Sequence, residues 1–163
     1  MPQKNALSLD EVAKGVQENR GTADVSNVRG PGVSPGDAVL RCEDVYFERS
    51  RTKGRLQMVA ACTIIAHEDS DQAGNSIQKR WGLEKTEDND PLAWLKADCE
   101  NVGITPLTAV TTEELQRMQS EWQGICFAAA LTENPGYPPN IFINANARRD
   151  EKNAVQNLDN SRL

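Results

Sequence analysis

The order of elements along the chain predicts a mainly β protein with helices, in which five strands form an OB-like barrel. Three segments rich in β-forming residues follow one another between residues 37 and 83. Two amphipathic helical segments come next, and a hairpin follows between residues 125 and 148. This order predicts a helical insertion between strands three and four. At 163 residues, the chain has room for one core of ordinary domain size.

The first three strands are expected to pair as antiparallel neighbours. Segment 37–48 is rich in β-forming residues and is interrupted by charged ones, which suits a strand with one wet face. Segment 56–66 is the most apolar run in the sequence and is apolar on both faces, so it is expected to be a central strand covered on both sides. Segment 77–83 alternates again and forms the third strand, and Gly54 is a natural corner in the turn before the second strand.

Capping residues and apolar spacing predict the two helices. Asp90 is expected to cap the first helix, with Pro91 at its first helical position, and Gly103 ends it. Thr111 or Thr112 caps the second helix, whose apolar residues recur at spacings of three and four. Both helices are expected to pack on the sheet by one face.

The last two strands are expected over 125–132 and 140–148, where they form a hairpin. Trp94 and Trp122 lie within the two helical segments, and we expect both of them in the core.

The flanking regions are expected to lie outside the folded domain, which then spans residues 37–148. Residues 1–36 end in a stretch dense in glycine and proline and are interpreted as a flexible segment and linker. Residues 149–163 are polar and charge-balanced and are expected to be disordered. No apolar run approaches the roughly 20 residues of a membrane span, and the N-terminus lacks the apolar centre of a secretory signal. We therefore expect a cytoplasmic protein.

The charged residues are unevenly distributed. The net charge of −6 argues against wholesale attraction to nucleic acid, yet segment 49–55 holds four cations and no acid. Segment 84–100, in contrast, holds six acids and two lysines. The four cysteines are widely spaced and are expected to be buried thiols, and the single histidine, His67, is expected in a surface loop. No metal and no cofactor are expected from this pattern.

Three short motifs occur in the strands and helices just described. They are Trp81-Gly82-Leu83 at the end of the third strand, Pro91-Leu92-Ala93-Trp94-Leu95 followed by Gly103, and Gly124-Ile125 opening the hairpin that Asn140-Ile141-Phe142-Ile143 closes. Together, over about residues 37–148, they resemble a phage-associated OB-fold family thought to bind single-stranded DNA. The resemblance implies a role in phage-type replication or recombination inside the host cell. Its implied partners are single-stranded DNA, replication or recombination proteins, and further copies of the chain.

A non-specific single-strand binder needs cations that follow the phosphates and aromatic rings on which bases stack. The loop between strands one and two is a usual wall of the OB groove, and here it is the basic segment. The expected nucleic-acid-binding residues are Tyr46, Phe47, Arg49, Arg51, Lys53, Arg55, Lys79, Arg80, Trp81, Phe142 and Arg148. Only one of Tyr46 and Phe47 faces outward, because strand neighbours point to opposite faces. Trp81 stays open between a core position and a stacking platform.

The acidic stretch 84–90 leaves a second function open. It is either the solvated loop before a helix, whose N-terminus favours carboxylates, or a shield for the basic loop or a docking surface. A docking surface would make the protein an interaction or assembly module. No catalytic activity is expected, because Asp88 and Asp90 lie in a turn without an apolar pocket and no nucleophile has a histidine partner other than His67. A magnesium-dependent nuclease is the remaining catalytic alternative.

Overall fold

The computed structural model describes residues 32–161, so most of the expected N-terminal segment lies outside the described residues. The strands are β1 (Gly36–Arg49), β2 (Leu56–His67), β3 (Ser76–Gly82), β4 (Cys126–Thr132) and β5 (Asn140–Arg149). The α-helices are α3 (Leu92–Val102), α4 (Thr112–Trp122) and α5 (Ala154–Ser161), and the short 3-10 helices are η2 (Ser70–Gln72) and η3 (Glu151–Asn153). None of the described helices is long and apolar enough to cross a membrane.

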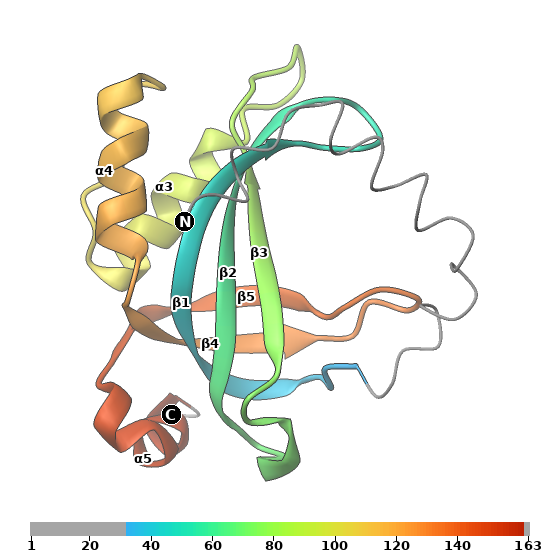
Figure 1. Cartoon of the computed structure of the whole chain (residues 1–163), viewed down its shortest axis with the longest axis vertical. Helices are drawn as coiled ribbons and strands as arrows, with labels where there is room; N and C mark the ends of the chain where they lie inside the picture. The colour runs from blue at the N-terminus through green and yellow to red at the C-terminus, as the bar shows by residue number, and fades with distance from the viewer. Residues whose placement is uncertain (1–31, 162–163) are drawn as a thin grey trace. The chain divides into compact units, whose positions relative to one another are not determined.

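The strands form one antiparallel sheet in the order β3-β2-β1-β4-β5, and the helices lie around it (Figure 1). The predicted mainly β fold, with α3 and α4 inserted between the third and fourth strands, is confirmed. All five strands begin and end within one residue of the predicted bounds, because runs of β-forming residues bounded by turn residues mark them clearly.

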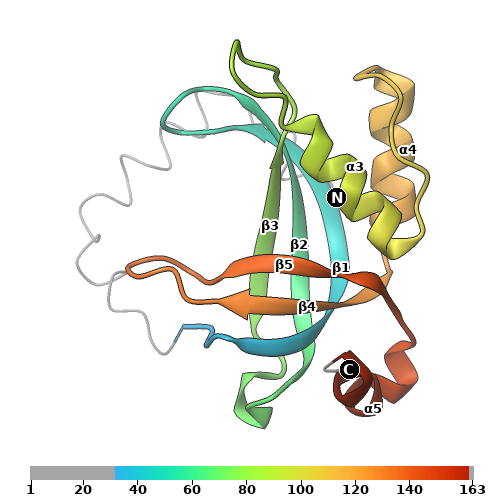
Figure 2. The ribbon, with the colours of Figure 1, turned by 180° about the vertical axis from the view of Figure 1, so that it is seen from behind.

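Strand β1 belongs to both halves of the sheet. Its first residues, Gly36–Arg41, pair with β4, while most of its length pairs with β2. Irregularities in its register after Val39 and after Cys42 accompany its bend. As a result, β4 and β5 cross behind β2 and β3 in Figure 1, and the view from behind shows them in front (Figure 2). The two halves of the sheet thus face each other across the core.

The sheet is open between its two edge strands, since no backbone pairing joins β3 to β5 among the described residues. Instead, Lys79 Nζ on β3 donates a hydrogen bond of 2.8 Å to the carbonyl oxygen of Ile141 on β5. The same ammonium lies 3.9 Å from the carboxylate of Asp98 on α3. The sheet is consistent with an OB-like arrangement, in which one lysine links the edge strands to the helix.

The end of α3 and the start of α4 follow the predicted caps, whereas α3 begins at Leu92 with Pro91, rather than Asp90, as its N-cap. Gly103 ends α3 with φ 78°, a left-handed conformation that glycine adopts at little cost. The hydroxyl of Thr111 accepts the backbone N–H of Glu114 and so caps α4. Both helices present their apolar face to the inner side of the sheet, which is why the insertion packs on the core.

One apolar cluster fills the space between the two halves of the sheet and the helices α3 and α4. The rings of Trp81 and Trp122 lie 5.0 Å apart between centroids, and Trp122 meets Phe127 edge-to-face at 6.0 Å. All four cysteines are buried and free, as predicted. The outer face of β2 is only half-buried at Ala61 and Thr63, so the prediction of a strand covered on both sides is only partly correct.

The C-terminal segment corrects a prediction. Residues 149–161 were expected to be disordered, but η3 and α5 form there and pack on the outer face of the sheet. Leu158 joins Val39, Ala66 and Cys126 in a second buried cluster. Residues 149–161 include few apolar residues, so their composition is polar. Composition does not show where a single leucine docks.

His67 is also a correction, because its side chain is buried rather than in a surface loop. Its Nδ1 accepts the backbone N–H of Asp69, and its Nε2 lies 2.9 Å from the carbonyl oxygen of Ser34. Since Nδ1 accepts, Nε2 carries the proton and donates to that carbonyl. The imidazole therefore ties the residues before β1 to the end of β2.

Candidate nucleic-acid interface

The turn between β1 and β2 carries three exposed cations, Arg51, Lys53 and Arg55. Within residues 32–161, no ion pair or side-chain hydrogen bond engages their charged groups. Two backbone hydrogen bonds of 2.8 Å, from Ser50 N to Arg55 O and from Gly54 N to Ser50 O, close the turn. The backbone is thus held in place while three side-chain charges remain available to an anion. We call Arg51, Lys53 and Arg55 the basic turn.

Arg49, the fourth cation of the predicted group, is engaged at the base of the turn. Its guanidinium donates to the carbonyl oxygen of Gly54 at 2.8 Å and lies 3.6 Å from the carboxylate of Glu84. Part of its charge is therefore compensated within the protein. Arg49 is a cation of the same segment, but its guanidinium has partners, which makes it a useful comparison residue.

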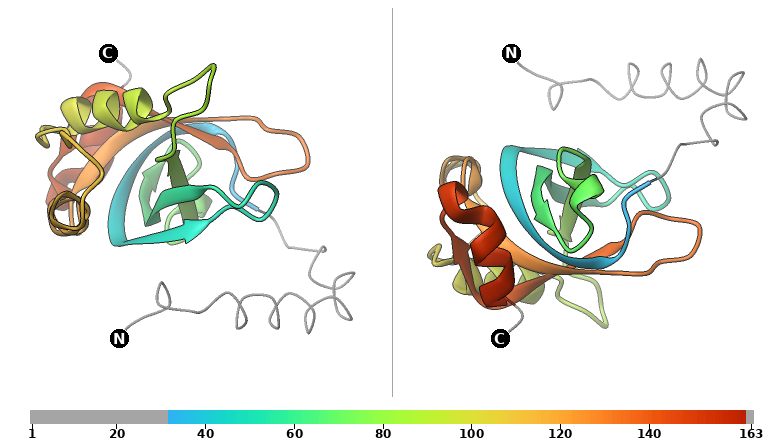
Figure 3. Two further views of the ribbon diagram at one scale, coloured as in Figure 1. Left: turned by 90° about the horizontal axis from the view of Figure 1, so that it is seen from above. Right: turned by 90° about the horizontal axis from the view of Figure 1, so that it is seen from below.

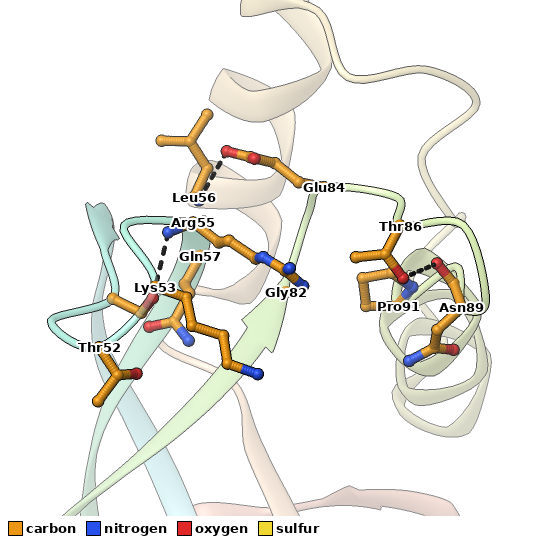
Figure 4. A pocket seen from close by; sticks show the side chains of 11 residues that line it. Thr52, Lys53, Arg55, Leu56, Gln57, Gly82, Glu84, Thr86, Asn89 and Pro91 are labelled. Carbon is orange, nitrogen blue, oxygen red and sulfur yellow. Dashed lines mark hydrogen bonds between the residues drawn. The ribbon is translucent and has the colours of Figure 1, made fainter.

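An open hollow of about 360 Å³ separates the basic turn from the loop that leads to α3 (Figure 4). Lys53 and Arg55 reach into it from one side, and Pro91, Thr86 and Asn89 line the other side. Cations beside hydroxyl and amide groups are suited to a phosphate-like anion. The hollow is wide open, so it is suited to part of a chain rather than to an enclosed small molecule.

Glu84 is the acidic group that lines this hollow. Its carboxylate accepts the backbone N–H of Leu56 at 2.9 Å as well as facing Arg49. This acid therefore holds the loop against the start of β2. Its charge is partly compensated by Arg49, so the acid does not cancel the free charges of Lys53 and Arg55.

Tyr46 and Phe47 divide between the two faces of β1, as the alternation required. Phe47 packs against the core, whereas Tyr46 lies on the outer face, where its hydroxyl accepts a hydrogen bond from Gln78 Nε2 at 3.0 Å. Burial raises the pKa of the Tyr46 phenol, which stays protonated. Arg80 shares this outer face and pairs with Glu48 at 3.2 Å. Of these residues, Tyr46 and Arg80 belong to the surface beside the basic turn, and Phe47 does not.

Trp81 and Lys79 face inward, so the structure does not bring them into the surface around the basic turn. Trp81 is 2% exposed, and its indole Nε1 donates to Asp98 at 2.8 Å. Lys79 Nζ lies 5.9 Å from the centre of the Trp81 ring. Burial lowers the pKa of Lys79 and raises the pKa of Asp98, while their mutual attraction opposes both shifts. These residues stabilise the junction of β3 with α3.

Phe142 and Arg148 lie on β5, apart from the basic turn. Phe142 is 54% exposed. It lies on the outer face of the half of the sheet formed by β4 and β5, which crosses behind β2 and β3 in Figure 1. Arg148 donates to the carbonyl oxygen of Val102 at the end of α3, a favourable place for a cation. The structure thus does not bring these two residues into the surface around the basic turn, and Arg148 has a structural partner.

Trp94 was predicted to be buried and is instead 66% exposed on α3. The buried residues of that helix are Leu95, Cys99 and Val102, and Trp94 stands about 100° around the helix from Leu95. The spacing of those three apolar residues is the signal that could have identified Trp94 as exposed.

Tyr137 is a second exposed aromatic residue that the sequence prediction missed. It is 75% exposed in the connection between β4 and β5, next to Gly136 and Pro138. An aromatic side chain between turn-forming residues has little to pack against, and this signal was present in the sequence. The hairpin that carries it projects from the same side of the domain as the basic turn (Figure 3).

Comparison with protein-family models and with curated proteins finds no match to this sequence.

Proposed function

We propose that this domain binds single-stranded DNA without sequence preference and that the basic turn makes its main phosphate contacts. The observation that carries the proposal is the set of three exposed cations that have no partner within residues 32–161 and are mounted on a hydrogen-bonded turn. Cations in such a position bind phosphates and release the counterions condensed on the nucleic acid. The short motifs that resemble phage-associated single-strand binders support a role in phage-type replication or recombination.

The aromatic residues near this side of the domain favour single strands. Tyr46 lies beside the turn on the outer face of β1, and Tyr137 projects on the neighbouring hairpin. Bases of a single strand stack on such rings, which contributes about 1–3 kcal/mol per base, whereas the bases of a duplex are already stacked on each other. In OB folds, these two connections are the walls of the binding groove.

The acidic net charge does not oppose this proposal. Charges separated by more than about 8 Å are largely screened at physiological ionic strength. A local group of uncompensated cations therefore decides the interaction at the turn, even in a chain with a net charge of −6. The acids elsewhere reduce the long-range attraction and hence the rate of encounter.

The test is fluorescence polarisation with a labelled oligothymidylate across a salt series. The triple variant R51Q/K53Q/R55Q should bind more weakly, and its log–log salt slope should fall by about 0.7 for each lost phosphate contact, or about 2 in total. R49Q is the matched control, because Arg49 is in the same segment but is engaged by Gly54 and Glu84. It should leave the slope nearly unchanged. Equal affinity and slope for wild type and a folded triple variant would refute the proposed site.

A second candidate function is a protein-interaction module that uses the loop before α3. The observation that favours it is the exposure of Glu87 and Asp88 in this loop, which projects from the domain beside the basic turn. Such a surface suits a basic partner. If the wild-type protein shows no polarisation change with single-stranded or double-stranded oligonucleotides at low salt, this candidate replaces the first.

A further inference from the structure

Trp94 is the largest exposed side chain on the helical insertion, and it is not part of the core. It is 66% exposed, whereas Trp81 and Trp122 are 2% and 0% exposed. A tryptophan side chain left in water gives up a large favourable burial free energy. The exposed indole is available to a partner that would cover it.

The position of Trp94 relates it to the hollow at the basic turn. The backbone N–H of Trp94 donates to the carbonyl oxygen of Pro91 at 3.0 Å, so these two residues are three apart on one turn. Side chains at this spacing lie on the same side of the turn, with about 5–6 Å between Cβ atoms. Pro91 lines the hollow that Lys53 and Arg55 enter (Figure 4), so Trp94 lies one turn of α3 from a residue of that hollow.

The acids near Trp94 have partners within the protein. Asp90 accepts the backbone N–H of Leu92 at the start of α3, at 3.2 Å. Asp98, one turn after Trp94, is half-buried and accepts the indole N–H of Trp81 beside Lys79. The exposed acids Glu87 and Asp88 come before Pro91 in the chain, on the projecting loop. An anion can therefore reach the rim of the hollow from the side of the basic turn.

We propose that Trp94 stacks on a base of the single strand whose phosphates the basic turn holds, so that α3 forms part of the interface. This proposal rests on the proposed function. It adds a binding residue on the helical insertion, outside the groove formed by strands and hairpins. The phosphate held by Lys53 or Arg55 and the base on Trp94 would be contacts of neighbouring nucleotides. The stacking also provides a reason for preferring single strands, because paired bases do not expose a face to the indole.

The three tryptophans of the chain allow a direct test by intrinsic fluorescence. Trp81 and Trp122 are buried, so a base stacked on Trp94 should quench the exposed part of the emission. Titration with an oligothymidylate of about 16 nucleotides, the upper end of the site size of one OB fold, should quench the wild type. In W94F the quenching should disappear, while binding measured by polarisation remains, since phenylalanine also stacks.

Replacement by alanine tests the energy of the contact. W94A should weaken binding by about 5- to 150-fold and leave the salt slope unchanged, because it removes stacking and no phosphate contact. F142A is the matched control, since Phe142 is also an exposed aromatic residue but lies on the outer face of β5. It should bind like the wild type. Near-ultraviolet circular dichroism of the buried tryptophan pair confirms that both variants are folded.

The outcomes separate this inference from the proposed function. If polarisation shows binding but the wild type is not quenched, or if W94A binds like the wild type, Trp94 is not in the interface and the proposed function stands. Trp94 would then be assigned to a protein contact. If polarisation shows no binding by the wild type, the proposed function and this inference are both refuted.

Discussion

At the scale of single residues, alternation along a strand determined which aromatic side chains reach solvent. Trp81 shares the inward face of β3 with Ile77, and its indole N–H finds the carboxylate of Asp98 inside the protein. This hydrogen bond avoids the cost of about 1–3 kcal/mol that an unpaired buried N–H carries. The sequence left Trp81 open between a core position and a stacking platform. Its hydrogen bond to Asp98 of α3 belongs to the core position.

We expect W81A to lower the free energy of unfolding by about 3–5 kcal/mol, the usual cost of removing a large aromatic side chain from a core. W81F keeps most of the packing but leaves Asp98 without its donor, so it should cost about 1–3 kcal/mol. Urea denaturation monitored by circular dichroism measures the free energy of unfolding of both variants. A folded W81F variant with wild-type stability but no DNA binding would show that Trp81 acts in binding after all.

At the scale of elements, Arg117 of α4 holds the connection between α3 and α4 against α4. Arg117 donates to the carboxylate of Glu114 through Nε and Nη2, both at 2.9 Å. It also donates to the carbonyl oxygens of Thr105 and Pro106, at 2.8 and 3.1 Å. Glu114 in turn accepts the backbone N–H of Thr108 at 3.0 Å. This network fixes an irregular segment whose backbone has few other partners.

The Glu114 network should make stability depend on pH in the acid range. Arg117, followed by the N–H of Thr108, lowers the pKa of Glu114 from 4.5 to about 2. Between these values, the unfolded state binds more protons than the folded state, so stability rises with pH there. The contribution is present above about pH 5 and is lost as the pH falls toward 2. Chemical denaturation at a series of acid pH values should show a shallower loss in E114Q than in the wild type.

The control for this prediction is E113Q, because Glu113 is exposed beside Glu114 in the same first turn of α4. E113Q should retain the acid dependence of the wild type. The interaction is close to solvent, so added salt should reduce the effect. Identical acid profiles for E114Q and the wild type would contradict the assigned role of Glu114.

At the scale of the whole molecule, the folded domain extends further toward the C-terminus than predicted. Besides Leu158 in its apolar cluster, η3 contributes Glu151, whose carboxylate pairs with Arg41 of β1 at 2.6 Å. Arg41 also pairs with Glu43 at 2.6 Å, so a small charged network borders the apolar contact. The helix α5 is therefore part of the domain and covers the outer face at Val39 and Cys126.

A chain that ends at residue 148 should therefore be less stable than the full chain. The loss should be at least about 2 kcal/mol, the free energy of burying one leucine side chain, and the variant should bind a hydrophobic dye more strongly. L158A in the full chain should change stability in the same direction. Thermal unfolding measures the stability of both variants. Unchanged stability in both variants would restore the prediction of a disordered tail.

Local patterns were sufficient to predict most of the fold. Runs of β-forming residues between turn residues placed β1 to β5, and Thr111 and Gly103 marked helix ends through their own backbone and side-chain chemistry. The exposure of segment 49–55 was likewise predictable, because four cations without an acid cannot be buried. These features depend on residues close together in the chain.

The sequence by itself determined the order of elements and the charge of the turn, because periodicity and composition are local properties. Tertiary structure alone decided that Lys79 links the two edges of the sheet and that Leu158 docks on the outer face. Each of these depends on which surfaces meet after the chain folds, and the partners lie far apart in sequence. Burial is a property of the packed molecule, so the pattern of a single segment does not contain it.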